Sequence, residues 1–299
     1  MDRLQLMSIY VAVAEAESFA GGARRLGLSP PAVTRAIAAL EERLGIKLLL
    51  RTTRHVRVTE AGQRYLDDAR RIIAEVDEAD EAAAGINAEP RGHLSVTAPS
   101  LFGKLFVLPG IVDYLQRYPG MEVAAMFLDR VVNMLEEGVD VAIRIGELPD
   151  SSLKAIPVGQ VRRLLVATPA YLAARGMPAA PADLAYHSVI LAGSIAPQVD
   201  WRFGPAQAPV SVRLRPRLAV SNNDAAIDAA RRGLGITRVL SYQLAPYLAS
   251  GELVTVLDGF MPPPLPVHVV HRESRYGSVK VRSFIDLISN RLRAEASLR

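Results

Sequence analysis

The segment between residues 18 and 62 constrains the fold more than any other part of this chain. It contains two short helical patterns joined by a tight turn at Gly27 and Leu28, and a basic arm rich in β-forming residues follows. Ser29 stands before two prolines, where its hydroxyl can cap a helix start and the missing proline N–H groups cost little. This layout is typical of a winged helix-turn-helix, which predicts binding to duplex DNA. The apolar stripe of the second helix is predicted to consist of Val33, Ile37, Leu40 and Leu44.

The opposite face of the second helix is small apart from one arginine, as a helix that enters a major groove requires. Pro31, Thr34 and Arg35 fall on that face at about 100° per residue, and we expect them to meet base edges. Ser29 is expected to meet a phosphate, and the wing to reach phosphates or a minor groove. For each arginine the alternative is an ordinary solvated position. The predicted DNA contacts are Ser29, Pro30, Pro31, Thr34, Arg35, Arg51, Thr52 and Arg54.

Charge divides the chain into blocks. Residues 18–57 contain eight Lys or Arg and two Glu, a local net charge of +6, although the whole chain has only +4. Residues 59–89 contain three basic and nine acidic residues, a net charge of −6. A phosphate backbone would attract the basic block, less strongly as salt rises, and blocks this different indicate separate modules.

A long helical pattern follows Thr59 and continues to about Asn87. Its apolar residues alternate by four and three, which is the period of a coiled-coil seam. We therefore expect this helix to pair two copies of the chain, because helix-turn-helix proteins commonly bind two half-sites as dimers. The alternative is one amphipathic helix packed on its own domain. The predicted seam consists of Tyr65, Ala69, Ile72, Val76, Ala79, Ala83 and Ile86.

From Arg91 onward, strand and helix patterns alternate, which predicts an α/β domain with a parallel sheet. Strands are expected at 94–98, 123–128 and 139–145, with helices at 109–117 and 131–137. A looser alternation fills 162–265, and a strand at 267–271 and a helix at 279–293 then return to the first lobe. Two lobes with two crossings would form a hinged cleft for a small ligand. The expected domains are 1–58 for DNA binding, 59–89 for the linker helix and 90–299 for the ligand, with lobe I at 90–161 and 267–299 and lobe II at 162–266.

Composition limits the chemistry and the location. The chain has no cysteine, which excludes disulfides and thiolate metal sites. No segment approaches the roughly 18 apolar residues of a membrane span, and Asp2, Glu15 and Glu17 argue against a signal peptide. We therefore expect a soluble, cytoplasmic protein without cofactor or metal. One face of an N-terminal helix is predicted from Leu4, Met7, Val11 and Ala14.

Together these motifs resemble the LysR-type transcriptional regulators. The resemblance implies a homo-oligomer, often a tetramer, with a winged helix-turn-helix, a linker helix and a two-lobed, periplasmic-binding-protein-like (type 2) α/β effector domain. It continues through 94–103, 128–153, 169–187, 230–236, 248–257 and 281–287. In the first 62 residues the matching positions are Ser18-Phe19-Ala20, Leu26, Ser29, Ala32-Val33, Ile37, Leu40-Glu41, Leu44-Gly45, Leu48, Arg51, Arg54, Val56 and Thr59-Glu60-Ala61-Gly62.

Three places depart from the family pattern. Gly21 and Gly22 replace a usual pair of alanines, at a cost of about 1 kcal/mol for each glycine inside a helix. Pro30 stands where many members have glutamine, so one polar DNA contact is lost or moved. Leu49 replaces a common phenylalanine under the wing.

The resemblance also implies an effector site between the lobes. Loop 99–102 lies between a strand end and a helix start, where backbone N–H groups and Ser100 could hold a carboxylate, so an anionic effector is expected. The structural alternatives are a helix cap for Ser100, an ion pair with Asp140 for Arg144, and a core position for Trp201. The predicted contacts are Ser100, Leu101, Phe102, Phe127, Leu128, Asp129, Arg144, Trp201, Phe203, Asn222 and Thr237.

Two competing classes are a two-lobed α/β enzyme and a solute-binding protein, in which the N-terminal helices would serve only for assembly. Against an enzyme, His268 and His271 would point to opposite faces of a strand, and no G-x-S-x-G elbow occurs. Against a solute receptor, we expect no secretion signal, because Asp2, Glu15 and Glu17 argue against one. As a regulator, the chain would have as partners double-stranded DNA, a small-molecule effector, its own copies in a homodimer or homotetramer, and RNA polymerase, and no membrane.

Overall fold

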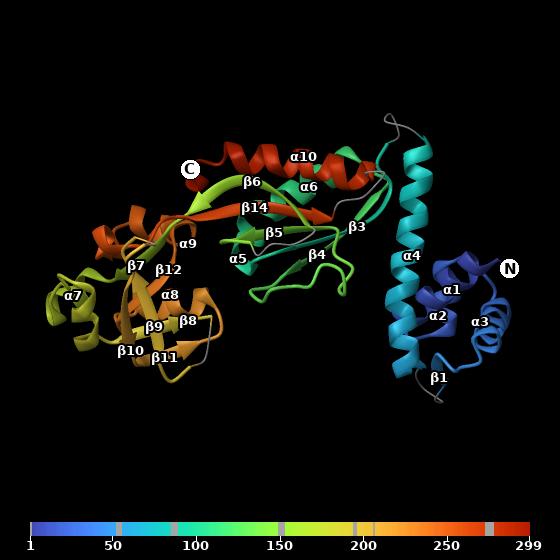
Figure 1. The fold of residues 1–299 in the computed structure, drawn as a ribbon, viewed down its shortest axis with the longest axis horizontal. Helices are drawn as coiled ribbons and strands as arrows, with labels where there is room; N and C mark the ends of the chain where they lie inside the picture. Colours follow the sequence, from blue (N-terminus) through green and yellow to red (C-terminus); the bar gives the residue numbers. More distant parts are fainter. Residues whose placement is uncertain are drawn as a thin grey trace.

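The computed structural model describes residues 2–51, 56–84, 89–148, 153–193, 196–205, 207–272 and 278–299. Figure 1 shows a helical N-terminal domain on one side of a long helix and a two-lobed α/β domain on the other. The predicted wing residues Thr52 and Arg54 and the predicted seam residue Ile86 lie outside the described residues. For Arg51 and Ala83 only the backbone is described.

The N-terminal domain has the predicted order of a winged helix-turn-helix. Its elements are α1 (Arg3–Glu15), α2 (Phe19–Arg25), α3 (Pro30–Leu44) and the antiparallel strands β1 (Leu49–Arg51) and β2 (Val56–Val58). Ser29 caps α3 by accepting the N–H of Ala32, and Gly45 ends the helix in the left-handed conformation with φ of 68°. The helix predicted from a serine cap and two prolines is confirmed.

The last member of the predicted stripe on α3 is wrong. Leu44 is 38% exposed, and Glu41 is buried instead. The chain turns back after the helix and lays the start of β1 over Glu41, whose Oε1 accepts the N–H groups of Leu48 at 2.9 Å and Leu49 at 3.1 Å. The Nζ of Lys47 donates to the other oxygen at 2.6 Å. Glu41 can occupy a core position because Lys47 and the backbone N–H groups of Leu48 and Leu49 bind its carboxylate.

The single apolar face predicted for α1 is too narrow. Leu4 and Val11 are only half-buried, whereas Leu6, Tyr10 and Val13, which lie off that face, are buried. Helices α2, α3 and the long α4 (Glu60–Ala84) all contact α1. A helix that is packed on several sides is apolar on most of its surface, which explains the wider burial.

Helix α4 is fixed to the N-terminal domain at its first turn. The Gly62 N–H donates to the Thr59 Oγ1 at 2.9 Å, and the Tyr10 hydroxyl donates to the Gly62 carbonyl oxygen at 2.9 Å. A Cβ at position 62 would lie 2.1 Å from the carbonyl oxygen of Leu48. Glycine is therefore required for this close approach of helix and wing.

Part of the predicted coiled-coil seam packs inside the chain. Tyr65 makes an edge contact with Tyr10, with ring centroids 5.6 Å apart, and Ala69 is 0% exposed. The prediction that Ala69 pairs with a second copy is therefore wrong, because a 3.5-residue period does not distinguish a partner helix from the chain's own domain. Ile72 and Val76, farther along α4, are half-buried.

Lobe I contains a five-stranded mixed sheet in the order β4-β3-β5-β14-β6. The neighbours β3, β4 and β5 are parallel, but β14 is antiparallel to β5 and to β6, so the prediction of a parallel sheet is wrong. The reason is that β14 returns from lobe II and enters the sheet from the opposite end. The strands are β3 (Gly92–Ala98), β4 (Met121–Phe127), β5 (Val141–Ile145), β6 (Leu153–Val161) and β14 (Leu265–Arg272).

The helical structure of lobe I begins earlier than predicted. It starts at Ser100 rather than at residue 109, and α5 (Ser100–Phe102), a π-helical segment (Gly103–Val107) and α6 (Leu108–Arg117) follow one another without a break. Gly103 makes this start compatible with β4, because a Cβ at that position would lie 2.3 Å from the ring of Phe127. The C-terminal elements that contact β6 are α10 (Val279–Ala294) and the 3₁₀ turn Ala296–Leu298.

The helix predicted at 131–137 is a turn in the structure. Asn133 closes the turn by accepting the N–H of Leu135 on its side-chain oxygen at 3.2 Å. Arg130 pairs with Glu137 across its base at 2.6 Å. Asparagine favours such local side-chain bonds over a continuing helix, which accounts for the difference.

Lobe II contains a second five-stranded mixed sheet in the order β11-β8-β12-β7-β13. Its strands are β7 (Arg163–Ala167), β8 (Val189–Ala192), β11 (Pro216–Val220), β12 (Ile236–Leu240) and β13 (Val254–Val256). One face packs on the hairpin of β9 (Val199–Phe203) and β10 (Val210–Leu214), on α7 (Pro169–Arg175) and on the 3₁₀ helix Pro181–Tyr186. The other face packs on α8 (Asn223–Arg231) and α9 (Ser241–Ala249). The chain passes between the lobes twice, at Arg162 and between β13 and β14.

Candidate nucleic-acid interface and effector cleft

The N-terminal end of α3 presents the residues that the sequence predicts to contact DNA. Ser29, Pro30, Pro31 and Arg35 are exposed, and Thr34 is half-buried. The Ser29 hydroxyl accepts a backbone N–H in capping the helix, and it keeps its own proton to donate outward. The structure therefore brings all five onto one accessible end of the helix.

A hollow lies beside Arg35 on the same surface. Its walls are Leu6 of α1 and three alanines of α3, Ala32, Ala36 and Ala39. Within the described part of the chain, the Arg35 guanidinium has no ion pair and no hydrogen bond. A free guanidinium among small side chains has the donors and the room to make paired hydrogen bonds to guanine.

Two of the described basic side chains in this domain are already neutralised by carboxylates. Lys47 pairs with Glu41 at 2.6 Å, and Arg25 pairs with Glu15. The remaining exposed arginines give this surface its positive charge, which attracts a phosphate backbone. Across residues 2–51 and 56–84, no carboxylate pairs with Arg24, Arg35, Arg43 or Arg57.

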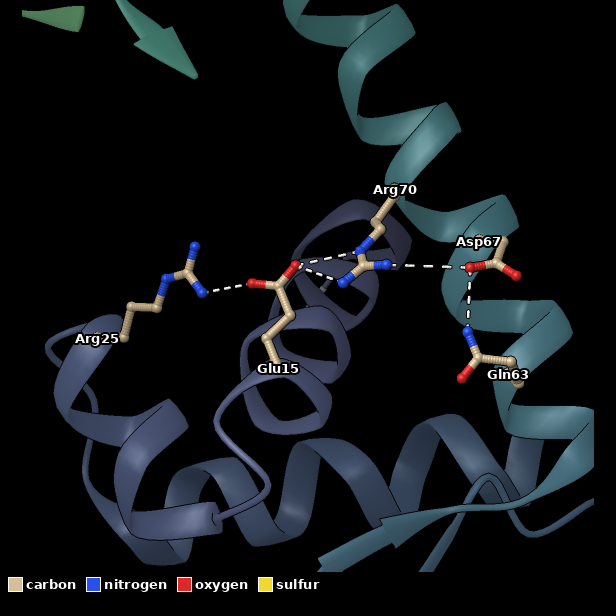
Figure 2. Close-up of polar contacts among 5 residues, drawn as sticks. All are labelled: Glu15, Arg25, Gln63, Asp67 and Arg70. Carbon is tan, nitrogen blue, oxygen red and sulfur yellow. Dashed lines mark hydrogen bonds and ion pairs between the residues drawn. The ribbon is translucent and has the colours of Figure 1, made fainter. Parts of the chain in front are cut away.

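Figure 2 shows Glu15 of α1 between Arg25 of α2 and Arg70 of α4. The Glu15 Oε1 accepts from the Nε of Arg70 at 3.1 Å and from its Nη2 at 2.9 Å. Arg70 also lies 3.9 Å from Asp67, which accepts from Gln63 at 3.2 Å. The contacts connect three helices, so the linker helix is attached to the DNA-binding domain at a second point.

The buried Glu41 is ionised in the folded domain. Burial by itself would raise the pKa of Glu41, but the hydrogen bonds from Lys47 and from the N–H groups of Leu49 and Leu48 outweigh it and lower that pKa. Sequence reasoning missed this role, since Glu41 and Glu42 look alike along the helix. The only signal was that Glu41 follows Leu40 directly beside the apolar stripe.

At the edge of lobe I, the structure gathers Ser100, Phe127, Leu128 and Asp129. Parallel pairing of β3 and β4 places Ala98 opposite Phe127 and brings the two strand ends together. The Ser100 N–H donates to the Asp129 Oδ1 at 2.9 Å, and its hydroxyl donates to the Phe127 carbonyl oxygen at 3.3 Å. The backbone N–H that was expected to hold an effector carboxylate is therefore used by the chain's own carboxylate.

Several predicted effector contacts are buried inside the lobes, and the structure contradicts these predictions. Phe102 is fully buried in the core of lobe I, and Trp201 and Phe203 are buried in the core of lobe II at 2% and 1% exposed. Thr237 is 0% exposed and donates to the carbonyl oxygen of Ile190 at 3.2 Å. Aromatic and β-branched residues at sheet positions are more often core than ligand contacts, which is the physical reason for the error.

The remaining predicted contacts have structural partners. Arg144 donates to the Val132 carbonyl oxygen and does not pair with Asp140, which instead accepts the Ser95 N–H at 2.8 Å. Leu101 packs against the core of lobe I. The exposed Asn222 caps α8.

An aromatic contact between the lobes was missed by sequence reasoning. Tyr242 of α9 in lobe II lies 5.3 Å from the Phe102 ring and 5.7 Å from the Phe106 ring of lobe I, between centroids. Burial raises the pKa of Tyr242, and the carboxylates of Asp129 and Asp224 raise it further. These two acids therefore lie close to this junction between the lobes.

The described residues contain neither a metal-binding cluster nor a helix that could cross a membrane. No group of three or more His, Asp or Glu side chains there is arranged to hold a metal ion. None of the helices that the structure describes has the length and apolar content needed to span a membrane.

Comparison with known families gives two matches that together span most of the chain. Residues 4–63 match the bacterial regulatory helix-turn-helix proteins of the lysR family. Residues 87–293 match the LysR substrate binding domain.

Individual relatives are similar over nearly their whole length. An uncharacterized HTH-type transcriptional regulator of Haemophilus influenzae is 31% identical over 281 residues, covering 94% of this chain and 98% of that protein. HTH-type transcriptional regulator PtxR of Pseudomonas aeruginosa is 32% identical over 297 residues, covering 99% of this chain and 95% of that protein. Among solved structures, full-length AphB, a virulence activator of Vibrio cholerae, aligns with a TM-score of 0.63 at 26% identity and covers 97% of this chain and 99% of AphB.

Proposed function

Because this chain belongs to the LysR-type transcriptional regulators, we propose that α3 reads the operator and that a small molecule between the lobes controls this binding. The chain is a DNA-binding regulator with an effector-binding domain, and it is not an enzyme. The observation that supports the DNA contacts best is the guanidinium of Arg35, which none of the described residues pairs and which lies on the exposed end of α3.

In this proposal, Arg35 reads a base edge while neighbouring residues fix the position of α3. Pro31 and Thr34 offer apolar contact to a thymine methyl, and Ser29 donates its hydroxyl proton to a phosphate. The wing residues Arg51, Thr52 and Arg54 reach the backbone or the minor groove. Pro30 supplies no donor, so it contributes shape alone.

The test uses an operator found by genome-wide footprinting and a random duplex of the same length. Arg35→Ala is expected to reduce the preference for operator over random DNA by about 1–3 kcal/mol. Arg54→Ala is the matched control, because loss of a phosphate contact weakens both duplexes alike. Fluorescence anisotropy at several salt concentrations measures both, and an unchanged operator preference in Arg35→Ala would contradict the assignment.

For the effector, we propose contacts with Ser100, Leu128 and Asp129 of lobe I and with Asn222 of lobe II, which are at least partly accessible. Ser100→Trp is expected to abolish the effector's influence on operator affinity while the affinity without effector stays unchanged. The reason is that the substitution fills the space beside residue 100 and leaves α3 untouched. A normal effector response in this variant would remove Ser100 from the site.

We also propose self-association into a homodimer and then a homotetramer. Of the described seam residues, Tyr65, Ile72 and Val76 are half-buried and Ala79 is exposed, and Tyr65 packs on the chain's own N-terminal core. Sedimentation of Ile72→Asp should show a smaller assembly than the parent chain. The proposal further includes a cytoplasmic location and contact with RNA polymerase at the promoter.

A further inference from the structure

Two arginines of lobe II lie side by side on one face of the sheet. Strands β7 and β12 are antiparallel, with Arg163 opposite Leu240 and Arg238 opposite Leu165. Because side chains alternate along a strand, Arg163 and Arg238 are diagonal neighbours on the same face. Leu240 packs against the core of lobe I, so the pair stands at the end of the sheet that meets lobe I.

Neither arginine has a carboxylate partner among the residues that the structure describes. The guanidinium carbon of Arg238 lies 4.8 Å from the centroid of the Trp201 ring, and its Nη1 donates to the Arg202 carbonyl oxygen at 3.3 Å. Arg163 makes no side-chain hydrogen bond within that part of the chain. Most donors of both guanidinium groups are therefore unused.

The surroundings make the two positive charges costly. Both side chains are half-buried. Burial lowers the pKa of Arg163, and burial together with the charge of Arg163 lowers the pKa of Arg238 to about 10. Half-buried charges of like sign are normally paired with an opposite charge. In the same lobe, Arg231 follows this rule, because it pairs with Asp228 and Glu252 at 2.9 Å each.

We propose that Arg163 and Arg238 form an oxyanion-binding site that takes the carboxylate of a small organic acid, with the guanidinium of Arg238 stacked on the buried ring of Trp201. Two adjacent guanidinium groups match the two oxygens of a carboxylate, and the aromatic ring holds one of them in orientation. The site rests on the proposed effector function and names its ligand class. It places the carboxylate of that ligand on lobe II, away from the negative charge of Asp129 at the Ser100 edge.

The chain contains its own reporter for this site, since Trp201 is the single tryptophan. The probes are sodium succinate and inorganic sulfate, titrated into the full-length protein at constant sodium concentration while chloride is replaced. We expect a saturable change in tryptophan emission with succinate. Sulfate tests whether the site selects carboxylates. If both probes bind, the site accepts oxyanions in general, and if succinate alone binds, the site accepts an organic acid.

Arg163→Gln is the main variant, because it leaves the stacking of Arg238 on Trp201 and therefore the reporter in place. We expect succinate to bind this variant at least 10-fold more weakly, and Arg238→Gln to show the same loss by calorimetry. Arg232→Gln, at the exposed end of α8, is the matched control and should bind like the parent. An unsaturable response, or equal affinity in Arg163→Gln and the parent, would overturn the site.

Operator affinity is measured in parallel, so that failure of this binding site can be distinguished from failure of the proposed regulatory function. Succinate binding that changes operator affinity supports both. Succinate binding with unchanged operator affinity overturns the effector role of the site, while Arg35→Ala still tests the operator contacts independently.

Discussion

The buried charge of the N-terminal domain and the arginine pair of lobe II differ in how the chain compensates them. In the N-terminal domain, the buried Glu41 has three donors, and Glu15 joins two arginines, so the charges inside and around the packed helices are compensated by the chain itself. In lobe II, Arg163 and Arg238 are half-buried without any described acid beside them. In the N-terminal domain, the arginines that no described carboxylate pairs lie on the surface, where DNA can bind. In lobe II, the two arginines without a described partner are half-buried, where we propose that a ligand binds.

The largest expected effect tests how completely the N-terminal scaffold is packed. Gly62→Ala should destabilise the domain by about 3 kcal/mol, the upper end of the usual range for overpacking, because the new methyl meets a backbone oxygen. Gly259→Ala is the control, since a Cβ there meets nothing within 4 Å. Thermal unfolding followed by circular dichroism measures the helices, and Trp201 fluorescence follows lobe II separately. Equal stability of the two variants would show that the backbone at Leu48 can move to make room for the methyl group.

A smaller effect on stability tests whether the three hydrogen bonds to the Glu41 carboxylate stabilise the domain. Glu41→Gln should cost about 2 kcal/mol at neutral pH, because it removes a charge that accepts three hydrogen bonds. Glu42→Gln, one residue along the exposed side of α3, is the matched control and should change little.

The same residue predicts a pH dependence. The folded pKa of Glu41 lies below its unfolded value, so its stabilisation is complete above the unfolded value, about 4.3, and is lost as pH falls through the folded pKa. Urea unfolding of the parent and of Glu41→Gln should therefore converge in acid. A difference that persisted at low pH would mean that packing, and not charge, accounts for the effect.

The smallest effect concerns the ion pairs of Figure 2. Glu15→Gln should cost less than about 1 kcal/mol, because Arg25 and Arg70 are well exposed and water screens them. The loss should shrink as salt is raised from low to molar concentration, which thermal unfolding would measure. A larger loss of stability that does not depend on salt would show that these ion pairs behave like buried ones.

The contrast also explains what could be predicted from the sequence. Helix α3 was predictable because its cap, its prolines and its period are all local, within the span from Ser29 to Gly45. The direction of β14 was not, because a strand pattern is the same whichever end enters the sheet. The burial of Trp201 depends on core residues that are distant in sequence, such as Leu165 and Ile236, and that of Glu41 depends on backbone donors after the helix has ended. Effector contacts inferred from the family therefore failed where long-range packing decides exposure.

The joint between Gly62 and Tyr10 has a mechanical consequence. Helix α4 has 25 residues, so it is about 37 Å long, close to one turn of DNA. Because its first turns are locked to the DNA-binding domain, helix and domain together act as a lever whose long arm ends at Ala84, before lobe I begins along the chain. A tilt of about 5° would displace the end of such an arm by about 3 Å, which is close to the rise of one base pair. Small movements at the far end of α4 are therefore similar in size to the spacing between neighbouring base pairs.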